Sequence, residues 1–281
     1  MKFTRDRLCL YSPAHPTRTS MEAIADHAVE LGVAGLEFRS FCPELKTPDR
    51  EVGRRLAKMT RERGLVIPCF SVAREMVQDT LEATEFVVKE LYSYAEICAD
   101  NEIPYLHHTI ALNFSAANLT EEEREARFQY CLEHVLKVCE YANRLGVRTI
   151  IEDQGFVFNG VKNCDRLCTI SDERIGIVAD LGNIMFVDEK PEDFIRAMGN
   201  RVCHAHLKDY FLFDEENETA RYKTKAGNFL KDAEMGTGDV NFAAVMDAFD
   251  AIDYKGFFAL EFSKLYDETE AERVIRRLEA M

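Results

Sequence analysis

Four short hydrophobic runs in the second half of the chain each end on a side chain that can bind a metal ion. They are residues 149–152, 177–180, 204–206 and 258–261. Three runs end on a carboxylate and one ends on an imidazole. Such an oxygen-rich set is typical of Mn²⁺ or Mg²⁺, with Zn²⁺ or Co²⁺ as alternatives. The pattern predicts one divalent metal ion, and the candidate ligands are Glu152, Asp180, His206 and Glu261.

The combination of these residues carries more weight than any one of them. A single acidic residue at the end of a strand is commonly a helix cap or a solvated loop carboxylate. Several carboxylates buried around one mouth are costly unless a cation compensates their charge. A shared ion is therefore the interpretation that explains the four endings together.

The elements that must position these side chains alternate between strand and helix along the whole chain. Most strand candidates are short apolar runs without alternation, as expected for strands buried on both faces. We expect strands at residues 8–11, 35–38, 66–70, 105–108, 149–152, 176–180, 202–206 and 257–262. Helical stretches separate them at residues 20–31, 49–63, 81–99, 121–145, 191–198, 242–252 and 268–281.

This alternation predicts the α/β class and a closed (β/α)₈ TIM barrel, with residues 1–281 as one domain. An open doubly wound sheet is the runner-up, but the glycine-rich turn expected after an early strand is absent from the sequence. In a barrel, active sites form at the carboxyl ends of the strands, so the four candidate ligands would meet at one rim. The irregular segment 209–241 would lie on the same rim as a candidate lid.

Composition favours a small-molecule ligand. The charge is −15, from 35 basic and 50 acidic residues, which argues against nucleic acid as the main partner. The apolar runs are too short for a membrane span, and the start of the chain lacks a signal-peptide pattern, so we expect a cytoplasmic protein. Nine cysteines without a CxxC pair indicate structural thiols in a reducing compartment. A homo-oligomer would suit helices that expose apolar residues.

Several motifs resemble those of one family. They are Ile151-Glu152, Ala179-Asp180-Leu181-Gly182-Asn183, His204-Ala205-His206-Leu207-Lys208-Asp209, Gly236-Thr237-Gly238-Asp239-Val240-Asn241-Phe242 and Leu260-Glu261-Phe262. The chain resembles the xylose isomerase-like TIM barrels, and more closely the sugar phosphate isomerase/epimerase group with its inosose isomerases and ketose 3-epimerases. The resemblance implies the same four metal ligands and proton transfer through a metal-stabilised enediolate.

Within that chemistry we expect Glu152 and Glu261 to be the catalytic acid/base pair, because they come from strands on opposite sides of the ion. The sequence also departs from the ketose 3-epimerases. Asn183 stands where a histidine is common, Asp153-Gln154 replaces an asparagine–histidine pair, and an arginine shortly after the metal histidine is missing. The departures leave room for an inosose-type isomerase, or alternatively for a lyase, either a dehydratase or an enzyme eliminating from an oxidised glycoside.

Other rim residues are candidates for substrate binding, and each also has a structural alternative. The candidates are His108, Asn183, Glu37 and Lys208. His107 and His108 are adjacent on one strand, so at most one faces the site. Glu37 could instead pair with Arg39, and His204 would lie one layer below His206. A nuclease is disfavoured by the seven histidines and the acidic charge, and a non-catalytic sugar-binding subunit by the intact ligand set.

Overall fold

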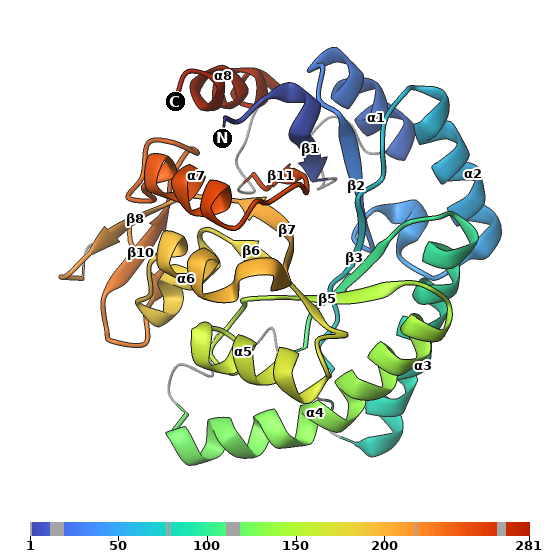
Figure 1. Ribbon diagram of the computed structural model, residues 1–281, viewed down its shortest axis with the longest axis horizontal. Coiled ribbons are helices and arrows are strands. Elements are labelled where there is room, and N and C mark those ends of the chain that lie inside the picture. Colours follow the sequence, from blue (N-terminus) through green and yellow to red (C-terminus); the bar gives the residue numbers. More distant parts are fainter. Residues whose placement is uncertain are drawn as a thin grey trace.

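Eight parallel strands close into a barrel, which confirms the predicted fold class. The computed structural model describes residues 2–11, 20–76, 78, 80–110, 119–216, 218–262 and 268–281. The order around the barrel is β1-β11-β7-β6-β5-β4-β3-β2 (Figure 1). The strands are β1 Leu8–Tyr11, β2 Gly35–Arg39, β3 Cys69–Val72, β4 Tyr105–His108, β5 Arg148–Glu152, β6 Gly176–Asp180, β7 Val202–Leu207 and β11 Phe258–Leu260.

Two strands differ by more than one residue from their predicted bounds. The third was expected from residue 66, but β3 begins at Cys69, and Val66 makes only an isolated bridge to Gly35. Pro68 lies between them and has no backbone N–H to give to a ladder, which delays the start of the strand. The last strand is shorter than expected and is paired only over Phe258–Leu260, so Glu261 follows it directly.

Helices surround the barrel between successive strands (Figure 1). They are α1 Met21–Glu30, α2 Arg50–Glu62, α3 Leu81–Asp100, α4 Glu121–Arg144, α5 Val161–Ile170, α6 Pro191–Met198, α7 Phe242–Ala251 and α8 Glu268–Glu279. Short 3-10 helices cover Arg5–Arg7, Pro43–Leu45, Asn183–Val187 and Gly199–Arg201. Thr120 and Glu123 form the expected capping box at the start of α4. Helix α5 was not among the predicted ranges, because cysteines make up much of its buried stripe, at Cys164, Leu167 and Cys168.

Apolar packing fills the space between the strands and the helices, and the floor of the barrel interior. Phe258 packs edge-on against Phe3 and Phe249, with ring centroids 5.1 and 5.0 Å apart. A small separate cluster of Cys69, Ile150, Val178 and Cys203 lies inside the barrel. All nine cysteines are free and buried, as expected for structural thiols.

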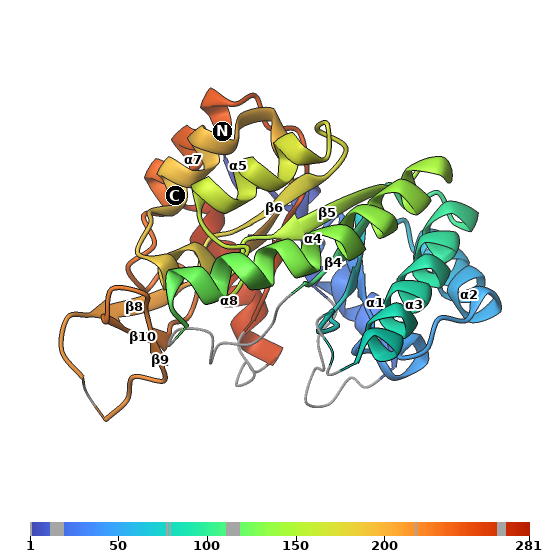
Figure 2. The same cartoon turned by 90° about the horizontal axis from the view of Figure 1, so that it is seen from below.

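The segment between β7 and α7 contains a small antiparallel sheet rather than an irregular loop. Its strands are β8 Tyr210–Phe213, β9 Tyr222–Lys223 and β10 Phe229–Asp232, in the order β8-β10-β9. The sheet extends beyond the barrel at one end of the molecule (Figure 2). We call it the side sheet. The predicted lid role of this segment stays a prediction.

Asp209 fixes the base of the side sheet. Its Oδ2 accepts backbone N–H groups of Gly236 and Gly238 at 2.9 and 2.8 Å. Its Oδ1 accepts those of Tyr210 and Val240 at 2.9 and 3.1 Å. One carboxylate thus ties the start of the side sheet to the glycine-rich segment that leads into α7.

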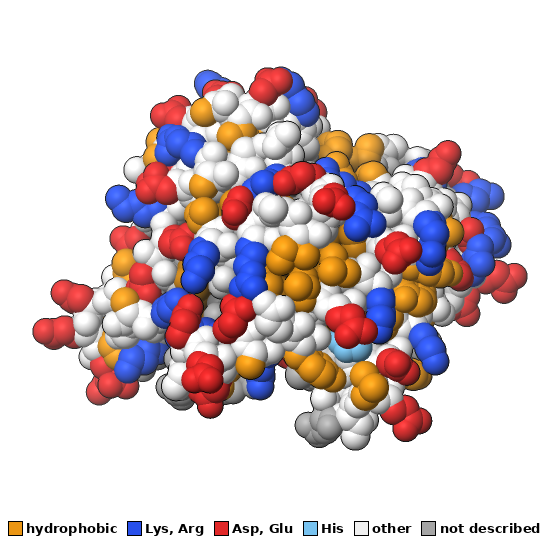
Figure 3. Space-filling view, turned by 60° about the horizontal axis from the view of Figure 1, so that its bottom comes forward, with side chains coloured by type: hydrophobic (Ala, Val, Ile, Leu, Met, Phe, Trp, Pro, Cys, Tyr) orange, Lys and Arg blue, Asp and Glu red, His pale blue; other side chains and the backbone are white. Residues whose placement is uncertain are grey.

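Acidic and basic side chains are interspersed on the face of the molecule shown in Figure 3, so the acidic excess does not gather there. Many of them form surface ion pairs, such as Arg166 with Glu125 at 2.6 Å and Arg63 with Asp26 at 2.7 Å. In the described ranges, none of the helices combines the length and the apolar character that crossing a membrane requires.

Candidate metal centre

The four predicted ligands converge at the carboxyl ends of neighbouring strands. One potential ligand atom from each of Glu152, Asp180, His206 and Glu261 lies within 4.8 Å of the others. Asp180 and His206 are register partners on β6 and β7, and Glu152 and Glu261 come from β5 and from the residue after β11. Glu152, Asp180 and His206 are 5%, 1% and 0% exposed, whereas the Glu261 side chain is 18% exposed. The site therefore opens toward solvent beside Glu261.

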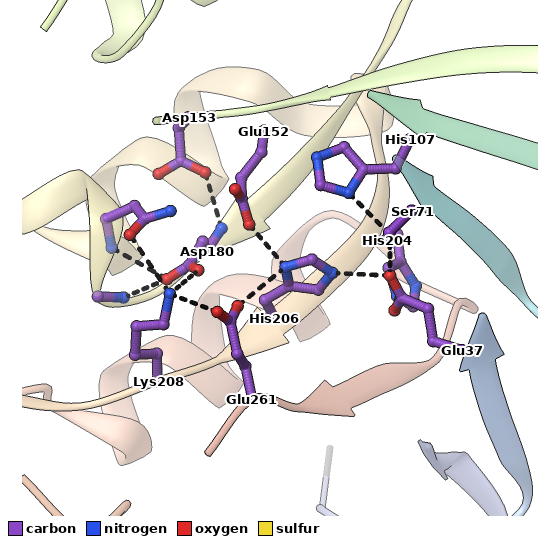
Figure 4. Close-up of polar contacts among 12 residues, drawn as sticks. Glu37, Ser71, His107, Glu152, Asp153, Asp180, His204, His206, Lys208 and Glu261 are labelled. Carbon is purple, nitrogen blue, oxygen red and sulfur yellow. Dashed lines mark hydrogen bonds and ion pairs between the residues drawn. The ribbon is translucent and has the colours of Figure 1, made fainter. Parts of the chain in front are cut away.

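Two cationic groups compensate the carboxylates (Figure 4). His206 Nδ1 lies 2.6 Å from Glu152 Oε1 and 3.4 Å from Glu261 Oε2. Lys208 Nζ lies 3.0 Å from Asp180 Oδ2 and 2.9 Å from Glu261 Oε1. Positive charge thus already lies among the acidic oxygens, as their burial requires.

The donor set fits a divalent ion. Glu261 Oε2 is buried and accepts no hydrogen bond from the described residues, although the His206 ring is near. Three carboxylates and one imidazole, gathered from neighbouring strand ends, match the ligand types of Mn²⁺, Mg²⁺ and Zn²⁺ sites. The residues that would hold the ion are Glu152, Asp180, His206 and Glu261, as the sequence predicts.

Burial and neighbouring charges shift the pKa values of these groups in different directions. Burial raises the pKa of Asp180 to about 7, even though Lys208 opposes the shift. Burial also acts to raise the pKa of Glu152, but His206 holds that pKa below the ordinary value. Burial likewise acts to raise the pKa of Glu261, but Lys208 and His206 hold that pKa below the ordinary value. For His206, burial lowers the pKa, but the charge of Glu37 and the hydrogen bond to Glu152 bring it well above the usual range. Without an ion, His206 is therefore held in its protonated form.

A second polar layer lies next to the four ligands, on the side of the His206 ring that faces away from Glu152 and Glu261 (Figure 4). Glu37 is fully buried, with Oε2 2.6 Å from His204 Nε2 and Oε1 3.3 Å from His206 Nε2. Ser71 Oγ donates to Glu37 Oε1, and it also lies 2.9 Å from His107 Nδ1. Burial opposes ionisation of Glu37, but His206 and His204 hold its pKa well below the ordinary value. Barrel interiors are usually filled by branched apolar side chains, so a polar layer at this place is unusual and points to a role at the site.

Two of the predicted substrate contacts, Glu37 and His108, do not line the open side of the candidate metal centre. Glu37 lies one layer below the rim and pairs with histidines rather than with Arg39. The choice of His108 over His107 is wrong, because successive strand residues face opposite sides and His107 is the one whose ring faces His206, at 5.5 Å. His108 is buried on the other side of β4, where its Nδ1 lies 3.3 Å from Thr109 O.

Lys208 and Asn183, the other two predicted substrate contacts, lie at the site itself. Lys208 Nζ lies 3.5 Å from Asn183 Oδ1, and the Asn183 backbone N–H donates to Asp180 Oδ1 at 2.9 Å. Asn183 Nδ2 is buried without a hydrogen-bond partner among the described residues. Their role in substrate binding stays a prediction. His204 lies one layer deeper than His206, as expected.

Sequence reasoning gave no role at the site to several residues that lie in it. The Tyr11 ring lies 4.7 Å from the His206 ring, and the Arg39 guanidinium lies 3.9 Å from the Tyr11 ring centroid. Asp153 Oδ1 accepts the Asp180 backbone N–H at 2.7 Å, which fixes the end of β6. Strand periodicity could have found Arg39, since it lies two residues after Glu37 and therefore on the same face.

This architecture defines the class of protein: the chain belongs to the xylose isomerase-like TIM barrel family, whose model matches residues 25–281. Among proteins of known name, it is 34% identical over 100 residues to an inosose dehydratase of Lactiplantibacillus plantarum, which is 34% of this chain and 33% of that protein. It is 26% identical over 133 residues to the inosose dehydratase of Geobacillus thermodenitrificans, covering 42% of this chain and 44% of that one. The matched region thus spans less than half of these relatives.

Solved structures share the fold over nearly the whole chain. The 3-keto-D-glucoside 4-epimerase YcjR from E. coli has a TM-score of 0.76 at 13% identity, covering 98% of this chain and 99% of that one. The IOLI protein, crystallised with a zinc atom, has a TM-score of 0.74 at 14% identity, covering 98% of this chain and 95% of that one. At such low identity these likenesses concern the fold.

Proposed function

We propose that this protein is a divalent-metal-dependent isomerase or epimerase of a small sugar, an inosose or a related polyhydroxy carbonyl compound. The observation that carries the proposal is the convergence of Glu152, Asp180, His206 and Glu261 within 4.8 Å at the catalytic rim of the barrel. When bound there, a divalent ion would act as a Lewis acid and make the proton next to a carbonyl easier to remove.

Glu152 and Glu261 are the proposed proton-transfer groups. The pKa values of both lie below the ordinary range despite burial, so both are ionised and able to accept a proton. They approach from β5 and from the end of β11, with β6 and β7 between those strands. A substrate held between them can lose its carbon-bound proton to one carboxylate and form an enediolate. The other carboxylate, once it has taken up a proton from solvent, returns a proton to the carbon.

Lys208 and Asp180 serve the same reaction as orienting groups. Lys208 Nζ bridges Asp180 and Glu261 at 3.0 and 2.9 Å, and its third N–H faces Asn183 Oδ1 at 3.5 Å. A substrate oxygen that approaches Glu261 can replace this long contact and accept the N–H. Asp180 is itself fixed, since it accepts the backbone N–H groups of Gly182 and Asn183 at 2.8 and 2.9 Å.

A dehydratase is the second candidate, and the inosose dehydratases among the relatives favour it. Elimination, whether of water or of an aglycone from an oxidised glycoside, begins with the same proton removal and then requires a donor for the leaving oxygen. Lys208 offers such an N–H, 2.9 Å from Glu261 Oε1. Both candidate reactions therefore begin at the same carboxylates.

Incubation of the Mn²⁺-loaded protein with inosose and with ketoses in D₂O separates the two candidates. Isomerisation or epimerisation introduces deuterium with the mass balance of the sugar retained, whereas elimination releases water or an aglycone. Glu152→Gln and Glu261→Gln should each lower the rate by about 10²–10⁴-fold, because each removes a proton-transfer group. The exposed variant Glu140→Gln is the matched control and should keep the wild-type rate.

Two results would contradict the proposal. Unchanged turnover in both glutamine variants would remove Glu152 and Glu261 from the chemistry. Failure of the purified protein to take up any divalent metal, together with an unaltered Asp180→Ala variant, would remove the metal centre.

A further inference from the structure

A stack of three side chains leads from the candidate metal centre to the surface of the catalytic rim. The Tyr11 ring lies against His206, with centroids 4.7 Å apart. The guanidinium of Arg39 lies 3.9 Å from the centroid of the Tyr11 ring, and 5.0 Å from that of the Phe41 ring. Tyr11 is 5% exposed and Phe41 is 53% exposed, so the stack runs from the buried site to solvent.

Strand geometry places Arg39 above the polar layer. Arg39 ends β2, two residues after Glu37, and therefore shares the inward face of that strand. Tyr11, at the end of β1, is the register partner of Glu37. Arg39 is also electrically coupled to the site. Burial raises the pKa of Glu261, but Lys208, His206 and, more weakly, Arg39 bring it below the ordinary value.

Arg39 differs from the other cation of the rim in its partners. Lys208 is engaged by Asp180 and Glu261. Across the described ranges, by contrast, the Arg39 guanidinium forms neither an ion pair nor a side-chain hydrogen bond, and its contacts are with the two aromatic rings. Stacking occupies the faces of a guanidinium and leaves the N–H donors at its edge available.

We propose that Arg39 binds an anionic group of the substrate, a carboxylate or a phosphate ester, while the polyhydroxy carbonyl part occupies the metal centre. The planar fork of N–H donors matches both anions in a bidentate manner. The inference rests on the proposed function and narrows its substrate class to acidic polyhydroxy carbonyl compounds. The net charge of −15 does not oppose this, because charges farther than about 8 Å away are largely screened at physiological salt, whereas Arg39 is adjacent.

Calorimetric titration of the Mn²⁺-loaded protein with three related polyols tests the proposal. The probes are sorbitol, gluconate and sorbitol 6-phosphate, which share a carbon chain and differ in charge. The wild type should bind one of the two anions about 10- to 100-fold more tightly than sorbitol, as expected for a charge-assisted hydrogen bond pair. The preferred anion identifies the group as a carboxylate or a phosphate.

Variants of Arg39 show whether the preference belongs to this side chain. Arg39→Met should abolish the anion preference and leave sorbitol affinity unchanged, and Arg39→Lys should restore part of it. Arg55→Met removes an exposed arginine of α2 and is the matched control. A preference that persists in Arg39→Met would assign the anion to the metal and overturn the proposal, as would a wild type that lacks any preference. Metal uptake is measured first, so a failure of the proposed function is recognised separately.

Discussion

At the scale of single residues, Glu37 determines which ring nitrogen of His206 is available to bind a metal ion. Its carboxylate lies 3.3 Å from His206 Nε2, while His206 Nδ1 faces Glu152 and Glu261. A carboxylate that accepts the N–H on one side of an imidazole leaves the lone pair on the other nitrogen for the metal. We therefore expect Glu37 to position His206 rather than to contact the substrate.

Glu37→Gln should weaken Mn²⁺ binding about 10- to 100-fold, because the amide accepts the histidine N–H less strongly than the carboxylate does. Titration calorimetry measures the affinity, and the visible spectrum of the Co²⁺-substituted protein reports the ligand geometry. Glu90→Gln, which alters a carboxylate paired with Arg74 away from the site, is the control. Equal affinity in the Glu37 and Glu90 variants would rule out the positioning role.

Metal affinity should rise with pH. Asp180, with a pKa raised to about 7 by burial, and His206, held protonated by its acidic neighbours, must both lose protons to become ligands. Affinity should therefore increase between about pH 6 and about pH 8, with protons released to the buffer on binding. Calorimetry in buffers of different ionisation enthalpy measures that release. A pH-independent affinity without proton release would contradict the assignment of these two ligands.

At the scale of elements, Asp209 is a buried anchor at the base of the side sheet, since its carboxylate accepts four backbone N–H groups. The sequence showed a long irregular segment, because β8, β9 and β10 are short and are paired only with one another. The strands of the barrel itself were easier to predict than those of the side sheet. Their apolar runs are buried on both faces, and glycines follow the helices before them, as at Gly32 and Gly146.

Asp209→Asn should destabilise the protein by about 2–4 kcal/mol, because the new amide group must face N–H donors in place of one acceptor oxygen. Urea unfolding measures the loss, and limited proteolysis should show earlier cleavage within the side sheet. Asp214→Asn, an exposed change on the same segment, should behave like the wild type. If both variants unfold at the same urea concentration, the anchor contributes little.

At the scale of the whole molecule, the sequence predicted well which four side chains converge at the rim, and it predicted their surroundings poorly. Glu152, Asp180, His206 and Glu261 could be found because each ends an apolar run, and register then brings them together. The polar layer joins side chains from four strands, β2, β3, β4 and β7, which hold Glu37, Ser71, His107 and His204. A pattern along one strand does not reveal such pairing between strands. The same holds for Tyr11 and Arg39, which meet only when β1 pairs with β2.

The buried thiols allow unfolding of the protein to be measured by chemical labelling. All nine cysteines are buried and free, and burial raises the pKa of thiols such as Cys9, Cys69 and Cys164. A thiol-reactive dye attacks the exposed thiolate, so the native chain should react slowly and each opening event should expose sulfur to it. Labelling rate therefore counts how often the barrel opens, and a bound divalent ion should lower that rate in proportion to its concentration.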